Sequence, residues 1–353
     1  MARKVRLIAF YLPQYHPIPE NDRWWGAGFT EWRYVVQAKP AFPHHYQPHL
    51  PSELGFYDLR VPETRALQAD LARSNGIDAF CYYWYWFSGK RLLERPLADV
   101  IATKAPDFPF CVCWANENWT RHWDGRDDEV LVAQDYRDDD AARFIADLRP
   151  ALSDARYVRV GDRPLLLVYC PSALPDPARW AEIWRGEARR YGIGELHLAC
   201  VESVHQNPAD PRRFGFDAAV EFPPHWTRSH VLTDAIAGKR ADFRGVVLDY
   251  VSCAQAMLAR PDPGYPLFRG IMPGWDNTPR AGSNAHCFVN AEPANYERWL
   301  RGLVSQARAV DTDEEAIVFV NAWNEWGEGC HLEPDLRYGR AFLEANARAV
   351  AVP

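Results

Sequence analysis

Residues 316–334 read AIVFVNAWNEWGEGCHLEP, and the character of the chain changes within this stretch. The first five residues are apolar, which predicts a buried strand of a parallel sheet. Amides, indoles and the two carboxylates of Glu325 and Glu328 follow at the point where the strand should end. Buried strands rarely hold two Glu, and exposed turns rarely need two Trp. The stretch therefore predicts a strand that leads into a polar cleft with aromatic walls.

The pattern of an apolar run, a polar loop and an amphipathic segment recurs along all 353 residues. The apolar runs predict strands over residues 5–11, 77–85, 110–116, 165–169, 196–202, 216–222, 267–275 and 317–323. The amphipathic segments predict helices over residues 62–74, 138–152, 177–191, 246–259, 293–309 and 338–350. About eight strands that alternate with helices favour an α/β fold, namely a single (β/α)8 TIM barrel.

A doubly wound parallel sheet is the alternative fold. That fold usually has a glycine-rich turn after its first strand, where a phosphate binds. Here the first predicted strand leads into LPQYH at residues 12–16, so we favour the barrel. Residues 12–59 form a long loop between the first strand and the first helix, rich in Pro and aromatic residues. A loop of that length is more often a functional lid or wall than a linker.

Composition excludes several classes of function. The net charge is −7 and no run of Lys or Arg is present, which argues against nucleic acid as a partner. No stretch approaches the ~20 apolar residues of a membrane span, so we expect no membrane insertion. The N-terminus lacks the pattern of a secretory leader, and the 8 Cys are not spaced as a disulfide scaffold. We therefore expect reduced thiols and a cytoplasmic protein.

Nucleophile and metal motifs are weak in this sequence. There is no G-x-S-x-G, and no Cys lies beside a plausible base, so acyl transfer is unsupported. Three histidines follow predicted strands without the close paired spacing of a metal motif: His16, His205 and His225. We interpret His44, His45 and His49 as packing of a Pro-rich loop. We therefore expect neither a metal ion nor another cofactor.

Amides, carboxylates and aromatic rings recur at the predicted C-terminal strand ends, where barrel active sites lie. Sugar hydroxyls pair with amides and carboxylates, and sugar rings stack on indoles, of which the chain has 15. Each Glu taken alone could instead be a salt-bridge partner or a helix cap. As a set these residues predict a glycan-binding cleft. The candidates are Tyr11, Gln14, His16, Glu31, Trp32, Tyr83, Trp84, Trp114, Asn116, Glu117, Glu221, Trp275, Asp276, Trp323, Asn324 and Trp326.

Glu325 and Glu328 form the pair with the most specific chemistry. Glycosidic cleavage uses one carboxyl to protonate the leaving oxygen and a second as base or nucleophile. Residues three apart on a helical turn have Cβ atoms about 5–6 Å apart, and retaining enzymes hold their carboxyls about 5–5.5 Å apart. The spacing therefore permits retaining chemistry. The simpler alternative is that one Glu is buried to hold the loop.

Four motifs resemble the WbsX-like proteins, which are often labelled glycosyltransferases of O-antigen loci. They are AFYLPQYH at residues 9–16, WWG and FTEW within residues 24–32, CWANENW at residues 113–119 and WNEWGEG at residues 323–329. This group is similar in turn to the endo-α-mannosidases of glycoside hydrolase family 99. The resemblance covers nearly the whole chain and implies a single catalytic domain over residues 1–353, a (β/α)8 barrel like that of family 99.

The resemblance also implies a mechanism. In the endomannosidases the first Glu of the last motif takes the proton of the sugar 2-hydroxyl, so that O2 attacks C1 and forms a 1,2-anhydro intermediate. The second Glu protonates the leaving group and then activates water. By this resemblance Glu325 is the base and Glu328 the general acid/base, acting on an α-linked, mannose-like glycan. This chain has Gly327 where the endomannosidases usually carry His, which bears on the substrate.

Three functions follow as hypotheses. The first is a retaining glycoside hydrolase. The second is a glycosyltransferase of O-antigen or other surface polysaccharide, although no phosphate-cradling loop or clear D-x-D motif is present. The third is a glycan-binding barrel without catalysis. For the first two we expect Glu31, Glu117 and Asp276 to line one cleft with Glu325, because sites at one barrel face converge.

Overall fold

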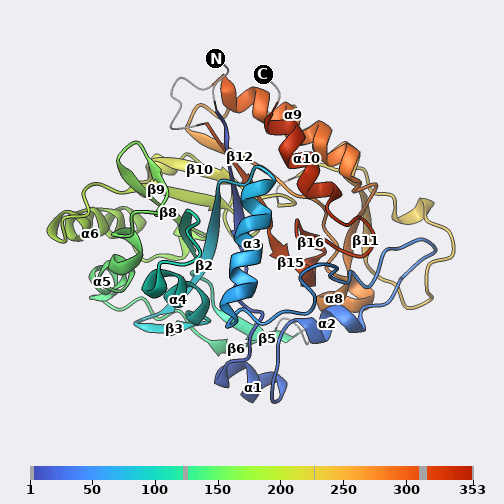
Figure 1. The fold of residues 1–353 in the computed structure, drawn as a ribbon, viewed down its shortest axis with the longest axis horizontal. Coiled ribbons are helices and arrows are strands. Elements are labelled where there is room, and N and C mark those ends of the chain that lie inside the picture. Colours follow the sequence, from blue (N-terminus) through green and yellow to red (C-terminus); the bar gives the residue numbers. More distant parts are fainter. Residues whose placement is uncertain (1–3, 122–125, 226, 310–315, 352–353) are drawn as a thin grey trace.

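The computed structural model describes residues 4–121, 126–225, 227–309 and 316–351. Its main sheet holds a closed ring of parallel strands (Figure 1). They are β1 (Arg6–Tyr11), β2 (Ala79–Phe87), β4 (Phe110–Trp114), β8 (Arg163–Val168), β9 (His197–Glu202), β10 (Ala218–Glu221), β12 (Leu267–Ile271) and β14 (Ile317–Val320). Strand β1 pairs with both β2 and β14, so Ile8 faces Ala79 on one side and Phe319 on the other. This closure confirms the predicted (β/α)8 barrel.

The strands are apolar on both faces because one face fills the barrel and the other packs under helices. In β8, for example, Leu165 through Val168 are fully buried. The covering helices are α3 (Pro62–Ser74), α4 (Arg95–Thr103), α5 (Asp140–Leu152), α6 (Pro177–Arg190), α7 (Tyr250–Leu258), α9 (Pro293–Arg308) and α10 (Ala341–Val350). Helix α6 has Pro177 in its first turn, and the Asp176 side chain caps it by accepting from the Arg179 N–H.

One predicted helix is partly wrong. Residues 246–259 divide into strand β11 (Val246–Asp249) and helix α7, which begins at Tyr250. The Asp249 side chain accepts from the Ser252 N–H and so fixes the start of the helix. Strand β11 pairs in parallel with β13 (His286–Val289), which the sequence reading missed. The short run VVLD therefore forms a strand because a partner segment forty residues later is available.

The remaining elements are short helices and strands within the loops of the barrel. They are α1 (Pro19–Trp25), α2 (Trp32–Gln37), α8 (Thr278–Ala281), β3 (Lys90–Leu92), β5 (Trp119–Arg121), β6 (Arg126–Val132), β7 (Arg159–Val160), β15 (Asn324–Glu325) and β16 (Cys330–His331). Helices α1 and α2 lie within the long loop that follows β1, and α2 lies beside α8 (Figure 1). This loop is therefore an ordered wall next to the segment that follows β14.

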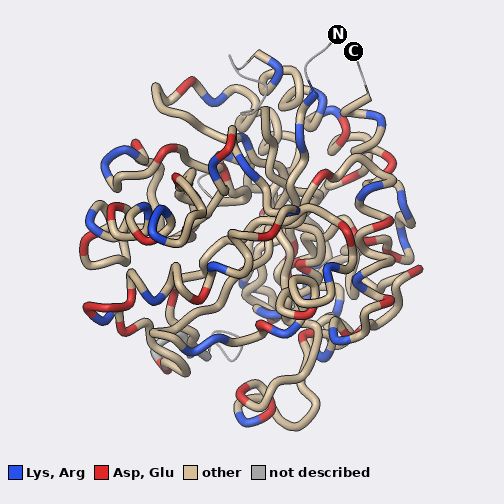
Figure 2. The backbone as a smooth tube through the Cα atoms, turned by 60° about the vertical axis from the view of Figure 1, so that its left-hand side comes forward, with Lys and Arg blue, Asp and Glu red and all other residues tan. Residues whose placement is uncertain are grey.

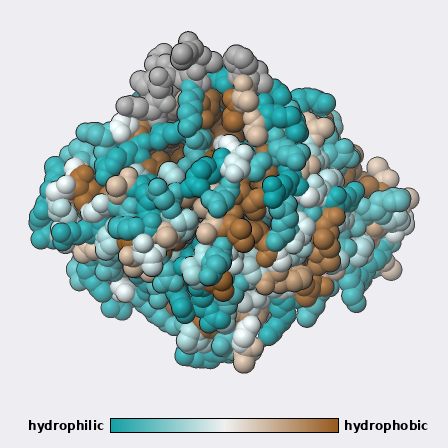
Figure 3. Space-filling view, viewed as in Figure 1, coloured by the Kyte–Doolittle hydropathy of each residue, from teal (hydrophilic) through white to brown (hydrophobic). Residues whose placement is uncertain are grey.

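Residues of opposite charge lie interspersed along the described part of the chain (Figure 2). Lys and Arg alternate with Asp and Glu around the molecule in Figure 2. Hydrophilic residues cover most of the face in Figure 3, and apolar residues show in patches between them. No helix within the described residues has the length and apolar character needed to cross a bilayer.

Candidate active site

Arg280 joins three glutamates after the eighth strand. Its Nη1 donates to Glu328 Oε1 at 2.5 Å, its Nη2 donates to Glu325 Oε2 at 3.0 Å, and its Nε donates to Glu31 Oε1. We call these four residues the Arg280 cluster. The Glu31 and Glu325 side chains are buried, whereas the Glu328 side chain is 20% exposed. One guanidinium therefore holds the carboxyls of Glu325 and Glu328 next to each other.

Local backbone structure sets this arrangement. Glu325 ends β15, and Trp326–Glu328 form a 3-10 turn, in which residues three apart stand nearly above one another. Gly329 closes the turn with φ of 57°, a conformation that favours glycine. Strands β15 and β16 then pair as a short hairpin, with Glu325 opposite Cys330. The hairpin presents both catalytic candidates on the same side.

Gly327 lies against the Arg280 cluster. A Cβ atom at this position would stand 2.3 Å from Glu31 Oε1 and 3.0 Å from Arg280 Nε. The ion pair of Glu31 and Arg280 thus occupies the space that a side chain at position 327 would need. The imidazole that the family resemblance suggests at this position has no room here.

Burial controls the protonation of Glu325. Its surroundings raise its pKa well above the ordinary value, first through loss of water and then through the negative charges of Glu328 and Glu31. The positive charge of Arg280 acts in the opposite direction. Glu325 therefore combines a raised pKa with a cation that helps it to ionise, which suits a group that exchanges protons.

Tyrosines surround the two carboxyls. Burial raises the pKa of Tyr83 and Tyr85, and the charge of Glu325 is the next cause for both. Burial also raises the pKa of Tyr169, followed by the charges of Glu117 and Glu328. These phenols stay protonated and can donate hydrogen bonds to sugar hydroxyls. Tyr83 is the predicted site residue among these tyrosines. Gln14, also predicted, donates a hydrogen bond to the Tyr85 hydroxyl at 3.4 Å.

Glu117 adds a further carboxyl to the same region. Burial raises its pKa to about 7. Its Oε1 lies 3.2 Å from Nε2 of His205. The negative charges of Glu117 and Glu328 both raise the pKa of Tyr169. The structure thus brings Glu31 to Glu325 through Arg280, and Glu117 and Glu328 have Tyr169 as a common neighbour.

Other predicted residues hold in place the hairpin of β15 and β16, which carries Glu325. The Asn324 side chain accepts from the Leu12 N–H at 2.7 Å and donates to the Leu12 carbonyl at 3.0 Å. The Trp326 indole donates to Glu333 at 2.7 Å and packs on Trp32, with ring centres 5.5 Å apart. Trp323 is fully buried. These residues fix the hairpin to the long loop and have no open face for a sugar.

Three aromatic candidates point outward from their strands. The Tyr11 hydroxyl donates to Gln68 of α3 at 2.7 Å. The Trp84 ring lies under the guanidinium of Arg91, 3.8 Å away. Trp114 packs among the rings of α5 and α6. Side chains alternate along a strand, so the neighbours of inward residues such as Tyr83 face the helices. These three are packing residues rather than binding residues.

Two polar candidates have structural partners. Glu221 accepts from Arg260 at 3.0 Å and from Arg269 at 2.8 Å. Asn116 bonds both the backbone N–H and the backbone carbonyl of Cys170, each at 2.8 Å. A buried carboxylate or amide is stable only when such bonds are made. Their contacts account for both residues without a ligand.

Three further candidates also differ from expectation. The Asp276 carboxylate accepts from His45 and Gln47, while only its backbone N–H contacts Glu328, at 2.6 Å. His16 is buried near Asp58, and burial lowers its pKa to about 4. Trp275 packs on His225 with ring centres 5.9 Å apart. None of these three side chains bonds to the Arg280 cluster.

Arg280 and Tyr169 were not among the predicted site residues, and His205 was considered only as a metal ligand. The predicted cleft consists of acids, amides, aromatic rings and a histidine, and it contains no cation to balance the carboxylates. Buried carboxylates require a positive partner, and that requirement was a usable signal. The sequence WDNTPR places Arg280 a few residues after the seventh strand, in the loop where such a partner is needed.

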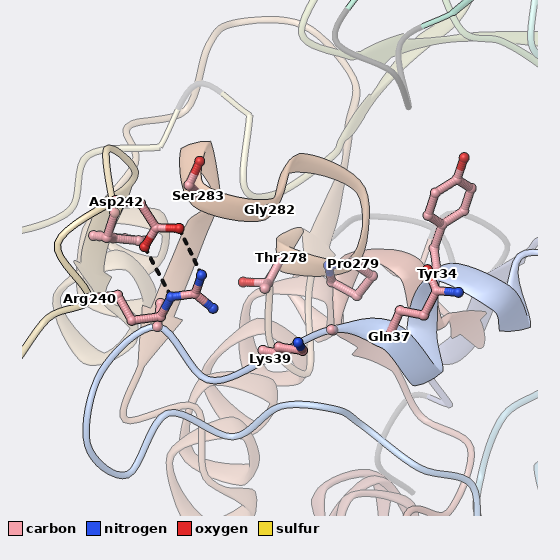
Figure 4. Close-up of a pocket in the computed structure, with 12 residues that line it drawn as sticks. Tyr34, Gln37, Lys39, Arg240, Asp242, Thr278, Pro279, Gly282 and Ser283 are labelled. Carbon is pink, nitrogen blue, oxygen red and sulfur yellow. Dashed lines mark hydrogen bonds and ion pairs between the residues drawn. The ribbon is translucent and has the colours of Figure 1, made fainter.

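A cavity of about 260 Å³ adjoins α2 and α8. Glu31 directly precedes α2, and Arg280 lies in α8. Figure 4 shows its lining, with Lys39, Thr278 and Pro279 around the hollow and Arg240 paired with Asp242 at one side. Neither Glu31 nor Arg280 lines this cavity. The cavity is therefore separate from the carboxyl pair.

A parallel barrel whose eighth strand leads to paired carboxyls, in a mouth lined with tyrosine, has the architecture of a carbohydrate-active (β/α)8 enzyme. The comparisons agree with this class. The chain matches the family described as Glycosyltransferase WbsX over residues 7–346, and it belongs to that family. The shared region spans the whole barrel and the Arg280 cluster.

Proteins similar in sequence and solved structures similar in fold add to this family assignment. The chain is 49% identical over 344 residues to "Uncharacterized protein WxcX" of Xanthomonas campestris pv. campestris, covering 98% of this chain and 49% of that protein. It thus spans about half the length of this relative. Its fold is similar to a glycoside hydrolase family 99 endo-α-mannosidase from Bacteroides thetaiotaomicron, with a TM-score of 0.58, 14% identity and coverage of 98% and 96%. The fold is also similar to a structure described as "Glycoside hydrolase-like protein". The TM-score is 0.60, the sequence identity is 14%, and the match covers 99% of this chain and 95% of that chain.

Proposed function

We propose that this protein is a retaining glycoside hydrolase that cleaves an α-linked, mannose-like poly- or oligosaccharide, with residues 1–353 acting as one catalytic domain. The observation that carries the proposal is the guanidinium of Arg280, which holds Glu325 and Glu328 side by side. Adjacent carboxyls at a strand end are what retaining cleavage requires. The fold shared with an endo-α-mannosidase supports the choice of substrate class.

The two carboxyls differ in a way that suits two roles. Glu325 is the more buried, and as a base it would take the proton of the sugar 2-hydroxyl while O2 attacks C1. Glu328 is more exposed and would donate its proton to the departing oxygen. It would then take a proton from the water that opens the 1,2-anhydro ring at C1, while Glu325 returns its proton to O2. Two inversions at C1 give net retention.

Arg280 has a defined part in this scheme. Burial alone would keep Glu325 protonated and unable to act as a base. The guanidinium stabilises the ionised carboxylate by a charge-assisted bond and thereby keeps its proton affinity within a usable range. It also fixes the orientation of both carboxyls before the glycan binds, which lowers the entropy cost of reaction.

Transfer is the second candidate, favoured by the family's description as a glycosyltransferase. The same carboxyl pair could pass the sugar to a hydroxyl of a growing surface polysaccharide instead of to water. This alternative also agrees with the cytoplasmic location that we propose. That location is supported by eight cysteines that are all buried and free of disulfides.

The test is a turnover assay with α-mannosides and bacterial O-polysaccharides, with and without nucleotide sugars. We expect release of reducing ends that is lost in Glu325→Gln and in Glu328→Gln. Glu63→Gln, an exposed site on α3, is the matched control and should retain activity. Release of nucleoside diphosphate coupled to chain growth would instead establish transfer. Glycan binding without turnover in every variant would establish a non-catalytic barrel.

A further inference from the structure

Two histidines from opposite ends of the chain meet at the wall of a second cavity, of about 440 Å³. His49 lies in the long loop after β1, and His331 lies in β16. His49 Nδ1 and His331 Nε2 are 2.9 Å apart. Asp335 completes the group, and its carboxylate and the two ring nitrogens all lie within 4.8 Å of one another. His331 and Asp335 are buried, and His49 is half-buried.

The surrounding backbone orients these donor atoms. His331 Nδ1 lies 3.0 Å from the Glu333 carbonyl and donates its proton there, so that Nε2 keeps a lone pair directed at the group. Asp335 Oδ1 accepts from the N–H groups of Arg337 and Tyr338, at 3.0 Å and 2.6 Å. Its Oδ2 lies 4.0 Å from His331 Nε2. Outer partners of this type are what hold metal ligands in place.

A neighbouring group of similar composition shows the contrast. His45, Asp276 and Cys287 also lie close together. There, however, Asp276 Oδ2 accepts from His45 and Gln47, and Oδ1 accepts from Thr278. Both carboxylate oxygens are already used in internal hydrogen bonds. In the group with His49, the two ring nitrogens share one hydrogen bond, and Asp335 uses Oδ1 for backbone N–H groups while its Oδ2 lies 4.0 Å from His331 Nε2. A bound ion would replace that single hydrogen bond between the rings.

We propose that His49, His331 and Asp335 bind a divalent transition-metal ion of the Zn²⁺ type. Two imidazoles and one carboxylate are a donor set that such ions prefer over Mg²⁺ or Ca²⁺. Tetrahedral coordination with bonds of about 2.0–2.1 Å puts two ring nitrogens about 3.3 Å apart. The present distance of 2.9 Å needs only a small opening to reach it. The cavity leaves a position for a water ligand.

The ion would join the long loop to the catalytic hairpin. The His331 ring stacks on Trp326 at 3.7 Å, and Trp326 directly follows Glu325. A metal bond from His49 to His331 would therefore lock the hairpin against the wall built by residues 12–59. This role is structural and does not depend on the glycan chemistry proposed above. It differs from our sequence expectation of no metal, which rested on local motifs only.

The experiment measures metal directly. The purified chain is stripped with a chelator, loaded with Zn²⁺ and dialysed, and its zinc content is determined by mass spectrometry. Affinity follows from competition with a chromophoric chelator, and Co²⁺ substitution reports coordination through its visible spectrum. We expect one bound ion per chain and a higher Tm with the ion.

His49→Ala and Asp335→Asn should each weaken zinc binding by about 100-fold or more. His286→Ala, an exposed histidine on β13, should bind as the parent does.

Two results would overturn the proposal. One is a wild-type chain that holds no zinc after loading and dialysis. The other is full zinc retention by both His49→Ala and Asp335→Asn. Asp335→Asn keeps Oδ1 for the two backbone N–H groups, so it tests the site even if His49→Ala folds poorly. Because zinc content and Tm are measured without a glycan, failure here is distinguishable from failure of the hydrolase proposal.

Discussion

Arg280 has one positive charge and three glutamate partners, so its cluster carries two surplus negative charges when all three carboxyls are ionised and one when a single carboxyl is protonated. Glu325 is the carboxyl whose raised pKa favours protonation. Glu31 is the most buried of the three and bonds the guanidinium at Nε, opposite the edge used by the catalytic pair. The cluster therefore separates Glu31 from Glu325 and Glu328, the two carboxyls that we propose exchange protons.

Arg280→Gln tests how this charge sets the pH dependence. Removing the cation raises the pKa of Glu325 further, because only burial and like charges remain. A base must be ionised, so activity falls as pH drops through that pKa. The acidic limb of kcat/KM should therefore move to higher pH by about one unit or more, which is a tenfold loss on that limb. Arg301→Gln on α9 is the control. Movement of the alkaline limb instead would mean that Glu325 acts as the acid.

Gly327→Ala tests the close contact in the cluster. The added methyl would overlap Glu31 Oε1 and press on Arg280. We expect a loss of about 1–3 kcal/mol in the free energy of unfolding, measured by urea denaturation, together with reduced kcat. Gly186→Ala in α6 is the matched control, since a Cβ there meets nothing within 4 Å. A gain in stability of up to about 1 kcal/mol is expected for it. Equal stability of the two variants would contradict the contact.

At the scale of elements, the barrel strands could be predicted because each is a short run of Val, Ile, Leu or aromatic residues between turn signals. Strand β14 was expected over residues 317–323 and ends at Val320, where the amides and indoles begin. Helix α3 was predicted with its bounds unchanged. Helices α1 and α2 were not predicted, because their residues resemble the Pro-rich loop around them. The periodicity of apolar residues predicts the elements of the core. It does not predict short helices within the long loop of residues 12–59.

The candidate site was only partly predictable for a different reason. Local pattern identified Glu325 and Glu328, but their alignment depends on Arg280 and on Glu31, which are 249 residues apart in sequence. The inward or outward orientation of Trp84 and Trp114 depends on strand register, which composition does not reveal. Long-range pairing therefore decided which candidates reach the mouth of the barrel.

Asn324→Ala tests the link between elements. Its side chain makes two bonds to the backbone of Leu12, so truncation leaves a buried N–H and carbonyl without partners. We expect a loss of about 1–3 kcal/mol in unfolding free energy and a lower kcat, because the hairpin is no longer fixed to the wall. Gln255→Ala, exposed on α7, should change neither quantity. Unchanged stability of Asn324→Ala in urea denaturation would show that the link is dispensable.

At the scale of the whole molecule, all eight cysteines are buried and unpaired. Burial raises the pKa of Cys81, Cys113 and Cys330 well above the ordinary thiol value, which suppresses the reactive thiolate. The folded protein should therefore react slowly with a thiol reagent such as DTNB, and eight thiols should titrate once guanidinium unfolds it. Tm should be the same with and without reductant. A rapid titration of the folded chain would contradict the described core.

Closure of the barrel has a consequence for how the chain is made. Strand β1 is translated first, yet one of its two neighbours in the ring is β14, the last barrel strand. Until residues 317–320 leave the ribosome, both β1 and β12 carry an unpaired edge that can recruit other chains. A ribosome that stops before residue 316 would release an open sheet with exposed edges, which holds Glu31 and Arg280 but lacks Glu325 and Glu328. Strand β14 therefore closes the ring, and the hairpin that follows it brings in the carboxyls of Glu325 and Glu328.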